Sequence, residues 1–257
     1  MMRIFFAILA CLWLATCGTS APPTTESVGP MVIGDRDPVD FDGLDPTRFA
    51  VRGMDAARFQ ERVDWRRAKA VGIEFAFLKA TEGGDLADPK FRDHWSGAAR
   101  AGIARGAYHF YYFCTDPQVQ ARWFIRNVPK TRGALPPVLD MEWNPFSPTC
   151  QRRPDAATVR AEMRTWLNIV ETHYGQRPII YTTPGFYEDA GLSRLKGYDY
   201  WLRSTAKTPA QAFPGQRWRF WQYTSTGTLP GTPGDIDINA FNGSRAAWEA
   251  WLAENAR

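Results

Sequence analysis

Two carboxyl side chains, Asp140 and Glu142, end an apolar run in the segment L-P-P-V-L-D-M-E-W-N. Residues two apart on a β-strand point to the same face of the sheet, about 6.6 Å apart along the strand. Because two close carboxylates do not both ionise easily, the pKa of one should rise and leave a proton donor near neutral pH. Cleavage of a glycosidic bond needs such a donor at the leaving oxygen. A solvated pair on an edge strand is the alternative, and the preceding Val138 and Leu139 disfavour it.

Other polar residues also stand where apolar strands end. Asp55 closes A-V-R-G-M-D, and Gln222 stands near the end of R-F-W-Q-Y-T, where we expect it to contact substrate. In G-D-I-D-I-N-A-F-N-G, Asp235, Asp237 and Asn239 alternate with isoleucines, which predicts a strand with one polar face. A calcium loop is the alternative, but the alternation fits an EF-hand poorly. In a barrel of parallel strands, such strand ends form the active site.

Several other chemistries lack their motifs. His94, His109 and His173 are too scattered for a zinc site, and no H-E-x-x-H or paired C-x-x-C occurs. His109 either lines the cleft or is a hydrogen-bonded structural histidine. No G-x-S-x-G elbow or phosphate-binding glycine loop occurs, which disfavours acyl and phosphoryl transfer. We expect no metal and no cofactor. The net charge of +4 comes without a basic run, so nucleic acid is not an expected partner.

Short apolar runs alternate with amphipathic stretches, which is typical of an α/β protein with a mostly parallel sheet. Helix candidates over residues 88–102 and 155–175 end at glycines, a common helix stop signal. Later connections are short and rich in Pro and Gly, so we expect an incomplete (β/α) barrel. The strand candidates are residues 50–55, 74–81, 106–113, 136–142, 178–183, 199–204 and 219–224.

The chain begins with an export signal. Arg3 precedes an apolar run over residues 4–15, and L-A-T-C resembles a bacterial lipobox in which Cys17 would be lipidated. Ordinary signal cleavage nearby is the alternative. We expect residues 1–17 to be the signal peptide, 18–48 a flexible tether and 49–257 the catalytic domain. The protein would then be exported and anchored to a membrane through Cys17, facing the periplasm or the cell surface, and we expect a monomer.

Two cysteines, Cys114 and Cys150, remain for the folded domain once Cys11 is removed with the signal and Cys17 is lipidated. Each follows a strand candidate, so neighbouring strands would bring both into adjacent loops. In an oxidising compartment they can form a disulfide. Two unpaired thiols are the alternative.

The chain resembles glycoside hydrolase family 25, the Chalaropsis-type muramidases. The resemblance covers about residues 52–245, and its parts occur in family order. They are G-M-D-A-A-R-F-Q, V-D-W, F-A-F-L-K-A-T-E-G, D-P-K-F, A-G-I-A-R-G-A-Y-H-F, L-P-P-V-L-D-M-E, R-P-I-I-Y-T, W-Q-Y-T-S-T-G and D-I-D-I-N-A-F-N-G. Departures from the family pattern lie after Asp55 and in N-P-F-S-P-T-C-Q-R-R-P-D, which follows Glu142.

This resemblance implies a flattened, incomplete TIM-like barrel of approximately (β/α)5(β)3 form. It also implies hydrolysis of the β-1,4 bond between N-acetylmuramic acid and N-acetylglucosamine in peptidoglycan glycan strands. Glu142 resembles the general acid and Asp140 its partner, with Asp55 and Asp237 as the other cleft carboxylates. The rings expected to face substrate are Tyr108, Tyr181, Trp201 and Trp221.

The sequence is compatible with more than one mechanism and with two other functions. Because the expected substrate carries a 2-acetamido group, we favour substrate-assisted cleavage with retention of configuration. The first alternative function is hydrolysis of chitin-type N-acetylglucosamine polymers by the same D-x-E pair. The second is a non-catalytic wall-binding lipoprotein, which would show a lost carboxylate, whereas all four expected carboxylates are present.

Overall fold

Eight strands close into a barrel within residues 32–256, the part of the chain that the computed structural model describes. In chain order they are β2 (Arg52–Ala56), β3 (Ile73–Glu82), β5 (Ala104–Phe110), β6 (Val138–Met141), β7 (Ile179–Thr182), β8 (Tyr200–Arg203), β9 (Phe220–Leu229) and β10 (Thr232–Phe241). Neighbours from β2 to β8 are parallel, and a parallel β8–β9 pairing follows. Strand β10 closes the ring antiparallel to both β9 and β2. The expected barrel-type α/β fold is confirmed.

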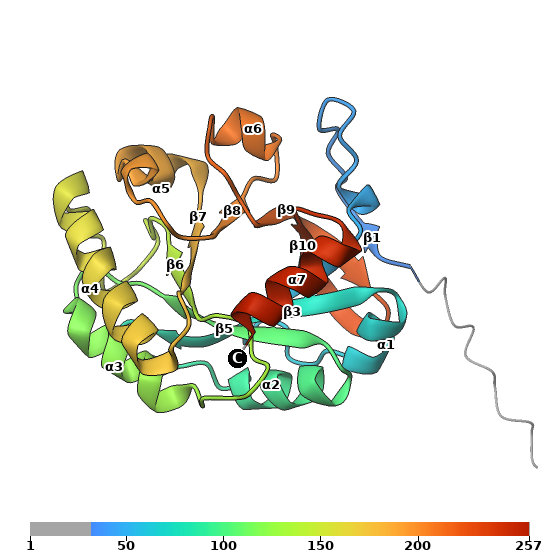
Figure 1. Ribbon diagram of the computed structural model, residues 1–257, viewed down its shortest axis with the longest axis horizontal. Helices are drawn as coiled ribbons and strands as arrows, with labels where there is room; N and C mark the ends of the chain where they lie inside the picture. Colours follow the sequence, from blue (N-terminus) through green and yellow to red (C-terminus); the bar gives the residue numbers. More distant parts are fainter. Residues whose placement is uncertain (1–31, 257) are drawn as a thin grey trace, which may run out of the picture.

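Helices separate the parallel strands and lie on the outside of the barrel (Figure 1). They are α1 (Trp65–Ala70), α2 (Phe91–Arg100), α3 (Pro117–Asn127), α4 (Ala156–Tyr174), α5 (Pro184–Asp189) and α6 (Pro209–Ala212), and α7 (Arg245–Asn255) follows β10. Helix α4 shows why the expected boundaries hold: Asp155 accepts the first backbone N–H groups, and Gly175 ends the helix at φ 69°. The four-residue α6 stands between β8 and β9. Five β/α units followed by three plain strands is therefore an approximate description.

Large rings fill the barrel interior, and α7 covers one end of it. Phe75 and Phe77 of β3 point inward and contact Phe220 at the start of β9. Trp248 and Trp251 of α7 pack against the same interior cluster, at the end where the parallel strands begin. This packing closes the amino-terminal end of the barrel. The polar residues that end the strands therefore gather at the opposite end.

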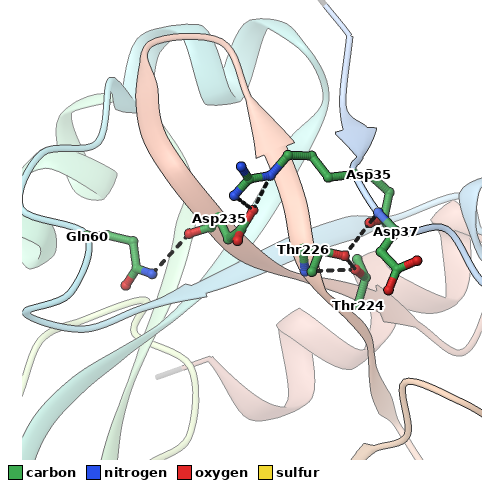
Figure 2. Close-up of polar contacts among 7 residues, drawn as sticks. Asp35, Asp37, Gln60, Thr224, Thr226 and Asp235 are labelled. Atoms are coloured by element: carbon green, nitrogen blue, oxygen red, sulfur yellow. Dashed lines mark hydrogen bonds and ion pairs between the residues drawn. The ribbon is translucent and has the colours of Figure 1, made fainter.

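Residues before 49 belong partly to the folded domain. The short strand β1 (Gly34–Asp35) pairs with β9, and Phe41 packs edge-on against Trp221 with only 4% of its surface exposed. The Thr226 hydroxyl donates to Asp35 at 2.6 Å (Figure 2). The Arg36 guanidinium pairs with Asp235 of β10. The expectation of a tether extending to residue 48 is therefore wrong for residues 34–48, because these contacts hold them on the barrel.

The other amino-terminal predictions lie outside the described residues. These are the signal peptide over residues 1–17, the lipidation of Cys17 and the first part of the tether. Among the helices within 32–256, none combines the length and apolar character that crossing a membrane requires.

The remaining short elements lie outside the barrel ring. Strand β4 (Leu86–Ala87) pairs with β3, and 3-10 turns occur at Pro46–Arg48 and Leu192–Arg194.

Candidate active site

Four carboxylates converge at the carboxyl ends of the parallel strands. Asp55 on β2 and Asp237 on β10 are direct partners in the antiparallel register, so their side chains share one face. Asp140 ends the inward face of β6, and Glu142 follows that strand by one residue. The charge of Glu142 raises the pKa of Asp140, and that of Asp237 raises the pKa of Glu142. The four acids that the sequence singled out therefore form one electrostatically coupled group.

Asp55 is held by two amide side chains. Its Oδ1 accepts hydrogen bonds from Gln222 Nε2 and from Asn239 Nδ2, each at 2.8 Å. Trp201 Nε1 donates to Asn239 Oδ1 at 2.7 Å, and the Tyr181 hydroxyl donates to Gln222 Oε1 at 3.0 Å. Burial first, and then the charge of Asp237, raise the pKa of Asp55 well above its usual range, although the two amides oppose this rise. The network fixes the position of Asp55, while burial and the charge of Asp237 favour its protonated form.

Asp140 is buried, and its Oδ1 has no hydrogen-bond partner among residues 32–256. Burial is the largest cause that raises its pKa well above the ordinary value, and Glu142 is the second. A buried carboxylate oxygen without a partner is costly and calls for an explanation. A donor on a bound substrate would satisfy it.

Glu142 combines burial with neighbouring cations. Burial raises its pKa, while Arg203 and Lys79 lower it and Asp237 raises it again. Lys79 lies in an ion pair with Glu82 at 2.6 Å, and its ammonium group lies 4.7 Å from the centre of the Phe110 ring. A carboxyl group with a raised pKa at the edge of a cleft can donate a proton near neutral pH.

All five residues expected to contact substrate are buried, and Trp221, Trp201 and Gln222 are the most deeply buried of them. Trp221 is fully buried on the outer face of β9, where its Nε1 donates to the Ser204 carbonyl. Trp201 is 2% exposed and stacks on Phe77 inside the barrel. Gln222 is 3% exposed and engaged by Asp55 and Tyr181. These three predictions of substrate contact are wrong, and Trp201 and Gln222 position Asp55 instead.

The two tyrosines lie beside the carboxylates. Tyr108 on β5 is 9% exposed, and Asp55, Asp140 and Asp237 all contribute to the rise of its pKa. Tyr181 on β7 pairs in register with Asp140 and with Trp201. Both hydroxyls stay protonated, because burial raises the pKa of each well above its usual range. The Tyr181 hydroxyl already donates to Gln222, which leaves the Tyr108 hydroxyl as the hydrogen-bond donor at the floor of the site.

The sequence did not single out Arg203 or two exposed rings at this end of the barrel. Arg203 ends the inward face of β8, beside Gln222 in the β8–β9 register. Phe59 is 74% exposed in the loop after β2, and Phe146 is 92% exposed in the loop after β6. A polar residue closing the apolar strand Y-W-L-R was the available signal for Arg203. Exposure of single rings in loops has no comparable sequence signal.

Cys114 and Cys150 form a disulfide that joins the loops after β5 and β6, with their Cα atoms 5.7 Å apart. The pairing expected from the sequence is confirmed. It fixes the loop that follows Glu142 against its neighbour.

His109 lies between Thr81 and Gln120, each within 3.0 Å of a ring nitrogen, and is fully buried. Burial lowers its pKa to about 4, so it is a structural histidine on the outer face of β5.

The family model of glycosyl hydrolases family 25 matches residues 54–232. Lysozyme M1 of Streptomyces globisporus is 33% identical over 275 residues, covering 94% of this chain and 88% of the lysozyme. The uncharacterized protein YegX of Escherichia coli K12 is 34% identical over 212 residues, covering 80% of this chain and 75% of YegX. A solved family 25 glycosyl hydrolase from Bacillus anthracis superposes with a TM-score of 0.73 at 35% identity, covering 79% of this chain and 94% of that one.

Proposed function

Because the chain belongs to glycosyl hydrolase family 25 and is therefore a glycoside hydrolase, we propose that it is a muramidase that hydrolyses peptidoglycan. The bond cleaved is the β-1,4 linkage between N-acetylmuramic acid and N-acetylglucosamine. The observation that carries this proposal is the coupling of Asp140 and Glu142, which keeps a proton available beside a carboxylate oxygen that has no partner among residues 32–256. The similarity to lysozyme M1 supports the same substrate class.

Catalysis begins with proton transfer from Glu142 to the glycosidic oxygen as the C1–O bond breaks. The acetamido oxygen of the same sugar attacks C1 and forms a cyclic oxazolinium ion. Asp140 orients the acetamido group and stabilises the positive charge that develops on it. Water then attacks C1, Glu142 takes its proton, and the ring opens to restore the acetamido group. Two inversions at C1 leave the product with the β-configuration of the substrate.

The test of function uses purified protein and a defined muropeptide polymer. Identification of the sugars at the new reducing ends should give muramic acid. Glucosamine at those ends would assign the enzyme to the other glycosidic bond. NMR of the first-formed product should show the β-anomer, and an α-anomer would exclude retention of configuration.

Substitution of Asp237 by Asn is expected to lower turnover only about tenfold, which corresponds to about 1.4 kcal/mol in the barrier. Burial raises the pKa of Asp237 to about 6 from 3.8. The folded protein therefore holds this proton more tightly than the unfolded chain. The resulting stabilisation is complete below pH 4 and is lost as the pH rises to 6. We expect Asp237→Asn to raise the free energy of unfolding by about 3 kcal/mol at pH 8 and hardly at pH 4.

Asp235→Asn is the matched control, because Asp235 lies two residues earlier on β10 and pairs with the exposed Arg36. Urea titrations at pH 4 and 8, with initial rates on peptidoglycan, measure both effects. An equal gain in stability at the two pH values would contradict the role given to the Asp237 carboxyl. A loss of turnover as large as that expected for Glu142 would make Asp237 part of the proton transfer.

Export and lipid anchoring at Cys17 are proposed on the amino-terminal sequence alone. The export signal and the L-A-T-C segment support them. Mass spectrometry of the protein from its native membrane should show a diacylglycerol on Cys17. Cys17→Ser should shift the protein to the soluble fraction. A mature chain that begins elsewhere and carries no lipid would replace the anchor with ordinary secretion.

A further inference from the structure

A pocket of about 840 Å³ opens between α5 and the loop that joins β8 to α6. Its volume lies in the range of sites that bind small ligands, about 300–1,000 Å³. Arg203, which also acts on the candidate catalytic acids, forms part of its wall. The side chains that matter for its chemistry are Tyr187, Glu188, Ser193, Arg203, Thr205 and Lys207.

Arg203 connects this pocket to the active site. It ends the inward face of β8 beside Gln222, and its charge lowers the pKa values of both Glu142 and Asp237. Within residues 32–256, its guanidinium makes no hydrogen bond and no ion pair. A guanidinium carries five N–H donors in a planar fork that matches a carboxylate. Arg203 is therefore a half-buried cation with its donors available to a ligand.

Lys207 gives the pocket a second cation. Its ammonium group has no ion-pair partner in the described part of the chain, and Glu188 is the one acid among the lining residues. The backbone around Lys207 is held, because Ser204 Oγ donates to the Lys207 carbonyl at 2.6 Å and Thr208 caps α6. The Lys207 side chain therefore extends from a loop whose backbone is fixed on the pocket wall. Two cations against one carboxylate favour an anionic ligand.

We propose that this pocket binds the carboxylate-bearing substituent of N-acetylmuramic acid, either the lactyl carboxylate or the carboxylates of a peptide attached to it. The proposal rests on the muramidase function above and extends it. The ionised members of the four-acid cluster repel an anionic substituent near the scissile bond. Arg203 and Lys207 offset that repulsion on one side of the cleft, and so the pocket selects muramic acid over an uncharged sugar.

Three forms of the same glycan test the proposal. They are peptide-bearing strands, strands stripped of peptide by an amidase, and stripped strands whose lactyl carboxylates have been converted to amides. The wild type should cleave the two charged forms about tenfold more efficiently than the amidated form, through a lower KM. Lys207→Glu should remove this preference by raising KM for the charged forms about tenfold. A preference for only one charged form identifies the source of the carboxylate.

Lys196→Glu is the matched control, because Lys196 is also exposed but lies before β8, at the other end of the barrel. Calorimetric binding to a Glu142→Gln background repeats the comparison without turnover. Equal wild-type efficiency and binding on charged and amidated strands would overturn the proposal, as would equal effects of the two lysine substitutions. Cleavage of all three forms without a charge preference leaves the muramidase function intact. Absence of muramic acid ends on every form rejects that function, and with it this proposal.

Discussion

Replacement of Glu142 by Gln is expected to lower peptidoglycan turnover on the order of 10³-fold while glycan binding persists. The amide has nearly the volume of the carboxyl group but no proton to give to the leaving oxygen. Burial raises the pKa of Glu142, whereas Arg203 and Lys79 hold it down, so the group can donate and then accept a proton. Rates of reducing-end release and calorimetric binding of strands separate the two effects.

Glu249→Gln supplies the control, because this exposed glutamate lies on α7 at the closed end of the barrel. Its turnover should equal that of the wild type. The wild-type rate should also fall at alkaline pH as Glu142 ionises. The residual activity of Glu142→Gln should lack this fall at alkaline pH. Full lytic activity in that variant would contradict the assignment of the acid.

The candidate acids were predictable because strand geometry is local. Alternation with period two fixes Asp140 and Glu142 on one face, and the same rule places Asp237 opposite the outward isoleucines of β10. The direction of a parallel strand then decides which end of the barrel carries them. Neither step needs knowledge of a distant contact. The same reasoning extends to the disulfide, since neighbouring strands place Cys114 and Cys150 in adjacent loops.

The burial of Trp201, Trp221 and Gln222 and the docking of residues 34–48 depend on more than local sequence patterns. Trp221 and Gln222 are adjacent on β9, so both cannot face the interior, and the structure turns Trp221 outward. Trp201 faces inward but is only 2% exposed, and periodicity alone does not predict the exposed fraction of an inward side chain. The docking of Phe41 on Trp221 joins residues 180 positions apart in a segment rich in turn residues. No local sequence pattern predicts such a contact.

The charge balance between Arg203 and the acids is likewise a tertiary property. Strand alternation places Arg203 on the inner face of β8, but its lack of an ionic partner in the described residues depends on how α5 and the β8–α6 loop pack. Lys79 differs, because it pairs with Glu82 three residues later on the same strand. Lys79 is therefore paired within the protein, whereas the Arg203 guanidinium remains available to a ligand. This difference makes Arg203 the better candidate for substrate recognition.

Replacement of Asp140 by Asn is expected to lower turnover about 10²-fold and to increase the stability of the fold. The loss of rate follows from losing a negative charge beside the developing oxazolinium ion. The gain in stability follows from replacing a buried group that ionises by a neutral amide of nearly the same volume. Burial raises the pKa of Asp140, so its ionisation destabilises the folded state as the pH rises. The gain should therefore grow from acid to neutral pH.

Opposite changes in activity and stability separate a catalytic role from a structural one, because a merely structural residue would lose both. Asp93→Asn on the exposed face of α2 is the control and should change neither activity nor stability.

Mass spectrometry of the wild type during turnover distinguishes substrate assistance from a covalent glycosyl-enzyme mechanism. Substrate assistance predicts no glycosyl adduct on the protein, since the acetamido oxygen is the nucleophile. An adduct on Asp140 would make this carboxylate the nucleophile and replace the oxazolinium pathway with a covalent one.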